Sequence, residues 1–111
     1  MPFNIAQQEK EEAIASIARR VAEATGAQEV WGFGSRIWGG DTNDSDLDLL
    51  VVVEMVAPDP ATIATRGYDA LPDVDIPIDI VVKSEEAFHI HADVTGSLAH
   101  TVRTSGRKLY G

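Results

Sequence analysis

The segment Leu47–Val53, with the sequence LDLLVVV, constrains the fold of this chain more than any other feature. All but one of its residues are aliphatic, which is the composition of a β-strand buried on both faces. Side chains alternate between the two faces of a strand, so a strand of this kind needs other elements packed above and below it. The chain is therefore expected to fold around this strand.

The segments on either side predict the elements that would surround the central strand. Residues 5 to 24 predict an amphipathic helix that ends at Gly26, because apolar residues recur at helical spacing. That stripe consists of Ile14, Ile17, Ala18 and Val21. Residues 29 to 33 (EVWGF) and 76 to 82 (IPIDIVV) predict two further strands. Asp59 followed by Pro60 predicts the start of a helix that reaches about Ala70.

The last third of the chain predicts another helix, with Ser84 as its N-cap. An apolar stripe continues through this segment toward Gly106, and Gly96 is the point where it could be interrupted. The stripe consists of Ile90, Val94, Leu98 and Val102. Leu109 and Tyr110 could add a short final strand. Together these elements predict one domain over residues 1–111, a mixed α/β or α+β fold with three to four strands flanked by helices.

The composition limits which kinds of binding partner and which cellular compartment we expect. Eighteen acidic and nine basic residues give a net charge of −9, which makes nucleic acid an unlikely direct partner and favours cations. The chain has no cysteine, so a bound metal would need oxygen or nitrogen ligands. It shows no apolar run long enough to span a membrane and no secretory signal pattern. We therefore expect a cytoplasmic protein.

Three aspartates could hold divalent cations. Asp46 and Asp48 are two residues apart at the start of the central strand, so their side chains share one face, while Leu47 and Leu49 point into the core. Asp79 lies within IPIDIVV, where a buried, unpaired carboxylate would be costly without a compensating charge. If the two strands are neighbours, the three carboxylates converge on a site for one or two Mg²⁺ ions, which prefer oxygen ligands.

Gly34, Ser35 and Arg36 follow the first predicted strand. A tight turn between a strand and a short helix can bind phosphate oxygens through backbone N–H groups and a hydroxyl. Glycine allows the backbone to approach closely, and Arg36 could contact a triphosphate or pair with one of the acids. These three residues are the candidate nucleotide-binding residues.

The pattern of Gly34-Ser35, ten intervening residues and Asp46-Leu47-Asp48 resembles the signature of the DNA polymerase β-like nucleotidyltransferase superfamily. The surrounding FGSRIWGGDTNDSDLDLLVVV most resembles the minimal nucleotidyltransferase proteins of bacteria and archaea, and Asp79 falls where they place a third carboxylate. The likeness covers most of the chain. One departure is Trp38, which stands where these proteins often carry a second basic residue.

The resemblance implies a reaction and a role for each residue. Asp46 and Asp48 would bind the Mg²⁺ that holds the triphosphate of ATP and would share both ions, and Asp79 would bind the second Mg²⁺ and help to deprotonate the acceptor hydroxyl. Ser35 would hold the distal phosphates. Small members of the family commonly pair with a HEPN-domain toxin, and they act as antitoxins by adenylylating a tyrosine of that toxin.

Other interpretations of these residues stay open. The enzyme could instead modify a small molecule, as antibiotic nucleotidyltransferases do, or the protein could be a non-catalytic antitoxin that neutralises its partner by binding. Asp79 could be a solvent-facing residue of an edge strand. A calcium-binding loop does not fit, because Asp46 or Leu49 would occupy the position that requires glycine, depending on where the loop begins.

Overall fold

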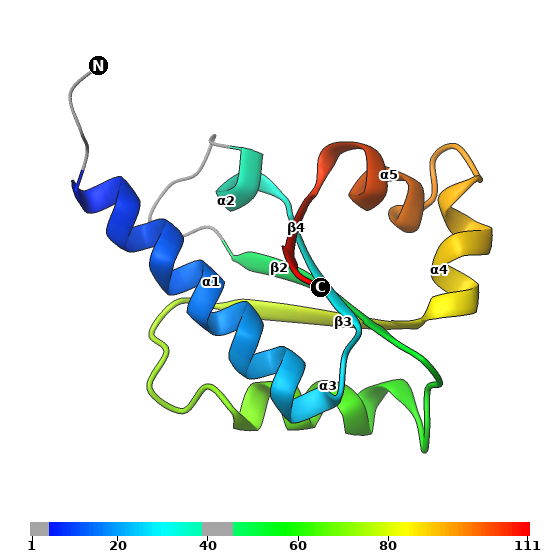
Figure 1. Ribbon diagram of the computed structural model, residues 1–111, viewed down its shortest axis with the longest axis horizontal. Helices are drawn as coiled ribbons and strands as arrows, with labels where there is room; N and C mark the ends of the chain where they lie inside the picture. The colour runs from blue at the N-terminus through cyan, green and yellow to red at the C-terminus, as the bar shows by residue number, and fades with distance from the viewer. Residues whose placement is uncertain (1–4, 39–45) are drawn as a thin grey trace.

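The computed structural model describes residues 5–38 and 46–111, and it forms an α+β fold with one four-stranded sheet (Figure 1). The helices, in chain order, are α1 (Ile5–Thr25), α2 (Ser35–Trp38), α3 (Pro60–Asp69), α4 (Glu85–Ala92) and α5 (Leu98–Ser105). The strands are β1 (Glu29–Phe33), β2 (Leu47–Val53), β3 (Ile78–Ser84) and β4 (Arg107–Tyr110). This architecture confirms the expected fold class.

The sheet is mixed, with the strand order β3-β2-β1-β4. β1 pairs antiparallel with β2 and with β4, whereas β2 and β3 are parallel. The connection between the parallel strands contains α3, as a parallel crossover requires. β2 is an inner strand, and all its residues except Asp48 are buried, so the prediction from its aliphatic composition is confirmed.

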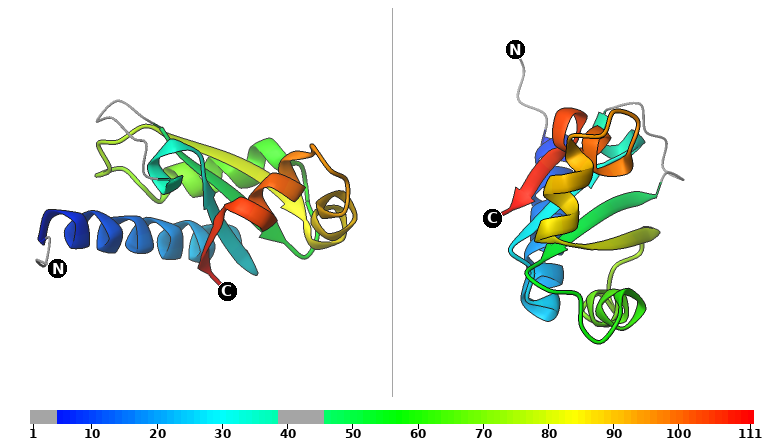
Figure 2. Two further views of the ribbon diagram at one scale, coloured as in Figure 1. Left: turned by 90° about the horizontal axis from the view of Figure 1, so that it is seen from above. Right: turned by 90° about the vertical axis from the view of Figure 1, so that its right-hand side faces the viewer.

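Two hydrophobic clusters cover the two faces of the sheet. On one face, α1 and α3 pack against Leu47, Leu49 and Val51 of β2. On the other face, α4 and α5 pack against Leu50 and Val52, with Phe88 as the largest buried side chain. Figure 1 shows α4 and α5 together at the end of the molecule where β3 finishes, and Figure 2 shows α1 running along the sheet with its first turns extending beyond it.

The predicted helix boundaries agree closely with the structure. α1 ends before Gly26, which has a φ of 72°, and the Asp59 side chain caps α3 by accepting the Thr62 N–H. The β4 strand at Leu109 and Tyr110 is also confirmed. β3 begins at Ile78, two residues later than expected, so Pro77 lies outside the strand.

The predicted stripe from Ile90 to Val102 is wrong for most of its length. Gly96 has a φ of 90° and separates α4 from α5, so one continuous helical face does not exist. Ile90, Val94 and Leu98 are 58%, 53% and 37% exposed, and of the stripe only Val102 is buried. Phe88, Ala92 and Ala99 form the buried side of this pair of helices instead.

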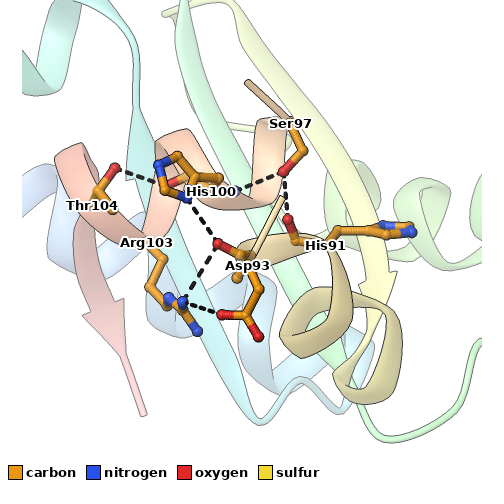
Figure 3. Close-up of polar contacts among 7 residues, drawn as sticks. His91, Asp93, Ser97, His100, Arg103 and Thr104 are labelled. Atoms are coloured by element: carbon orange, nitrogen blue, oxygen red, sulfur yellow. Dashed lines mark hydrogen bonds and ion pairs between the residues drawn. The ribbon is translucent and has the colours of Figure 1, made fainter. Parts of the chain in front are cut away.

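The corner between α4 and α5 is fixed by polar contacts (Figure 3). The Ser97 hydroxyl donates to the His91 carbonyl at 2.6 Å and accepts the His100 N–H at 3.0 Å. His100 Nδ1 donates to the Ala92 carbonyl at 2.9 Å, and Arg103 pairs with Asp93 at 2.9 Å. Ser97 therefore links the last turn of α4 to the first turn of α5.

We expect Ser97→Ala to lower the free energy of unfolding by about 1–2 kcal/mol, because it removes an N-cap and a second hydrogen bond together. Urea denaturation measures this change. Thr104→Ala is the matched control, since that hydroxyl bonds only within its own helix, and its effect should stay below about 0.5 kcal/mol. Equal effects of the two substitutions would contradict the bridging role of Ser97.

Candidate active site

The end of β1 and the beginnings of β2 and β3 lie together at one end of the sheet. β1 ends at Phe33, and the parallel strands β2 and β3 begin at Leu47 and Ile78. The register places Phe33 opposite Asp48, and Asp48 opposite Asp79. Residues directly opposite one another share a face of the sheet. Phe33, Asp48 and Asp79 therefore form a row across three strands, and we call Asp46, Asp48 and Asp79 the acidic cluster.

The acidic cluster lies on the face that α4 and α5 cover, but at the opposite end of the strands. Leu50 and Val52, further along β2, alternate onto the same face as Asp48 and are buried under these helices. Asp48 is half-buried, whereas Asp46 and Asp79 are exposed. The expectation that burial of Asp79 would demand a compensating charge is therefore wrong. β3 is an edge strand, and its start is open to solvent.

The acids nevertheless interact through their charges. Burial raises the pKa of the Asp48 carboxyl above its ordinary value, and the negative charges of Asp79 and Asp46 raise it further. A raised pKa means that the ionised form of Asp48 is disfavoured in the folded protein. A cation bound here would relieve this repulsion, so the electrostatics of the cluster favour cation binding.

Gly34 lies directly against Asp48. Its φ is 85°, in the left-handed region, and a Cβ atom there would overlap Asp48 Oδ2. The backbone conformation therefore favours glycine, and a side chain at this position would displace the Asp48 carboxylate. The sequence predicted a tight turn that lets the backbone approach a phosphate. The structure confirms the turn, and it shows that the group lying against Gly34 is the carboxylate of Asp48.

The short helix α2 starts at Ser35, immediately after this turn, and the Gly34 carbonyl accepts the Ile37 N–H at 3.1 Å. Ser35 is exposed and Arg36 is half-buried. Ser35 and Arg36 therefore directly follow the glycine that lies against Asp48. The Trp38 side chain and residues 39–45 lie outside the described residues.

The donor atoms fit Mg²⁺ in part. Across residues 5–38 and 46–111, no group of three or more His, Asp or Glu side chains is arranged so that it could hold a metal ion. Proteins usually bind Mg²⁺ through one or two carboxylates, with the remaining positions filled by water and substrate phosphates. Asp48 and Asp79, opposite each other on neighbouring strands, could supply such a pair.

A groove of about 290 Å³ lies on the other face of the sheet, between α1 and the segment before β3. Its floor includes Ile17, Val74 and Ile76, which pack against the core on the α1 side. Arg20 at its rim pairs with Asp73 at 2.5 Å. This groove is mainly apolar and is separate from the acidic cluster.

The structure adds two residues that the sequence did not indicate. Phe33 enters the row beside Asp48 only through the β1–β2 register, which the sequence pattern does not define. Tyr68, in α3, accepts the backbone N–H of Ile80 at 2.8 Å, a contact between residues on separate elements. No short motif marks either residue.

No protein-family model matches the chain, and no match is found among the curated proteins. The structure establishes a small α+β domain with a mixed four-stranded sheet and flanking helices, and these comparisons assign it to no family. No helix in the described part of the chain is long and apolar enough to cross a membrane.

Proposed function

We propose that the protein is a Mg²⁺-dependent nucleotidyltransferase that transfers AMP from ATP to a hydroxyl group. The observation that carries this proposal is the contact between Gly34 and Asp48 at the point where Asp48 also faces Asp79 across the parallel strands. It brings the glycine-serine turn and the paired acids of the resembled nucleotidyltransferase signature into one place. The raised pKa of Asp48 supports the same assignment.

Each residue has a role in this proposal. Asp48 and Asp79, with Asp46 beside them, would hold two Mg²⁺ ions whose remaining positions are filled by water and substrate phosphates, and the ions would neutralise the triphosphate and lower the pKa of the acceptor hydroxyl. Ser35 and Arg36, at the start of α2, would bind the distal phosphates and orient the leaving pyrophosphate opposite the acceptor. The half-buried position of Asp48 on an inner strand would fix its carboxylate more firmly than a loop could.

We propose that the acceptor is a tyrosine of a HEPN-domain toxin, and that the protein is its antitoxin in the cytoplasm. Every described element belongs to the sheet or to the helices around it, so the acceptor hydroxyl would come from another molecule. The net charge of −9 suits a basic partner surface. The resemblance to minimal nucleotidyltransferases supplies the identity of this partner.

The test is transfer of label from α-labelled ATP to a HEPN-domain toxin co-expressed with the protein, in the presence of Mg²⁺. We expect label on the partner, none after chelation of the metal, and none with the double variant Asp46→Asn/Asp48→Asn. Transfer that persists in this variant would overturn the assignment of the acids. Label on an aminoglycoside-like compound would instead favour small-molecule transfer, and full neutralisation of the partner by the double variant would favour a binding antitoxin.

A further inference from the structure

The position of Asp79 raises a structural problem. β3 is an edge strand, and Asp79 is its second residue and is exposed. Edge strands and strand ends open more readily than inner strands, because fewer hydrogen bonds hold them. A carboxylate that binds a cation together with Asp48 must stay at a fixed distance from Asp48. The start of β3 therefore needs support beyond its pairing with β2.

On the inner side, the ladder to β2 extends past the strand end. The Leu47 N–H donates to the Pro77 carbonyl at 2.9 Å, two residues before Asp79. The register then pairs Leu47 with Ile78 and Asp48 with Asp79. β2 therefore holds this end of β3 on one side only.

On the outer side, Tyr68 supplies the missing contact. The Tyr68 hydroxyl accepts the N–H of Ile80 at 2.8 Å, and Ile80 directly follows Asp79. In a parallel ladder, alternate residues direct their backbone groups to opposite edges. The Ile80 N–H thus points to the free edge, where it would otherwise depend on water.

The packing of α3 brings the Tyr68 hydroxyl to this place. The neighbouring Gly67 is buried, and a Cβ atom there would lie 2.9 Å from Ile80 Cδ1. The absence of a side chain at Gly67 therefore lets α3 approach β3 closely. Tyr68 itself is 41% exposed, so its ring is partly buried while its hydroxyl bonds to β3.

We propose that Tyr68 is a positioning residue that holds the start of β3, and with it Asp79, at a fixed distance from Asp48. This inference rests on the proposed function, because it assigns Tyr68 a part in Mg²⁺ binding through Asp79. Tyr68→Phe removes the acceptor oxygen and keeps the ring, so it loosens the strand end without opening the core.

The test compares Tyr68→Phe with wild type in three measurements on the full chain. Amide hydrogen exchange of Ile80 and Asp79 should accelerate by about fivefold, the factor that corresponds to an ordinary net hydrogen bond. The Mg²⁺ concentration that half-saturates binding of a non-hydrolysable ATP analogue should rise by about threefold to tenfold. The thermal unfolding midpoint should change by less than about 3 °C.

Tyr110→Phe is the matched control. Tyr110 lies in β4, the opposite edge strand, is 37% exposed, and makes no hydrogen bond through its hydroxyl that is seen within the described residues. Tyr110→Phe should leave all three measurements unchanged. A purely structural role of Tyr68 would lower the unfolding midpoint and accelerate exchange throughout the protein while the Mg²⁺ requirement stayed the same, and this outcome would overturn the inference.

The two proposals fail in different ways. If wild type does not bind the ATP analogue with Mg²⁺, the proposed function fails and Tyr68 has no site to position, even if exchange at Ile80 shows that it holds the strand. If wild type binds but Tyr68→Phe needs no more Mg²⁺ than wild type, the proposed function stands and the role of Tyr68 is refuted.

Discussion

Gly34→Ala is expected to lower the free energy of unfolding by about 2–4 kcal/mol and to reduce AMP transfer by at least about 100-fold. A side chain at a φ of 85° is strained, and its Cβ would overlap the Asp48 carboxylate. Either Asp48 or the turn before Ser35 must move, and both belong to the proposed site. Urea denaturation and label transfer from α-labelled ATP measure the two effects.

Gly96→Ala is the control that separates backbone strain from the overlap with Asp48. Gly96 also has a positive φ, 90°, but nothing lies within 4 Å of the position that a Cβ would occupy. It should therefore show the backbone strain alone, about 1–2 kcal/mol, and keep full transfer activity. If Gly34→Ala cost no more stability than Gly96→Ala and kept activity, the contact with Asp48 would have no importance.

Asp48→Asn is expected to reduce AMP transfer by at least about 1000-fold and, with metal ions removed, to raise the unfolding midpoint by about 2–4 °C. Activity falls because an amide is a weaker ligand for Mg²⁺ than a carboxylate. Stability rises because the substitution removes a charge that burial, Asp79 and Asp46 all disfavour. Solvent screening at this half-buried position keeps the gain small.

The sign of the pH dependence follows from the same pKa. Because the folded pKa of Asp48 is raised, wild type loses stability from this group as pH rises above the ordinary value of 3.8 and through the raised value. The rise in the unfolding midpoint of Asp48→Asn over wild type should therefore be complete at about pH 7 and absent at about pH 3.5. Thermal unfolding of both proteins in a chelator at the two pH values tests this.

Asp75→Asn controls for net charge. It removes one negative charge from an exposed position outside the acidic cluster and should change the midpoint by less than about 1 °C at either pH. An equal gain in Asp48→Asn and Asp75→Asn would mean that general charge repulsion, and not the cluster, destabilises the folded protein.

Local sequence signals predicted most elements because each depended on nearby residues. These signals each influence only the few residues around them, and the structure confirms them. They are the aliphatic composition of Leu47–Val53, the N-caps Asp59 and Ser84, and Gly26 after α1. The stripe through Ile90 failed because helical periodicity continues in the sequence across Gly96, whereas the backbone does not. The inward side of α4 is set by packing on β3 and β2 and by the contact of Phe88 with Trp31 of β1.

The arrangement of the candidate site was predictable in part. The spacing of Gly34, Asp46 and Asp48 is a sequence pattern, and the neighbouring β2 and β3 strands bring Asp79 beside Asp48 as the sequence analysis required. The exposure of Asp79 depends on β3 being the edge strand, which follows from the pairing order of the whole sheet. Tyr68 and Phe33 depend on contacts between distant segments and could not be predicted.

The parallel pairing of β2 with β3 also determines when the site can form during folding. Gly34 and Asp48 come together through an antiparallel pair, but Asp79 joins them only after the chain has passed through α3 and returned to β2. Contacts between segments so far apart in sequence carry a large chain-closure cost and form slowly. A nascent or partly unfolded molecule that lacks β3 could therefore keep the turn against Asp48 and still have no complete site.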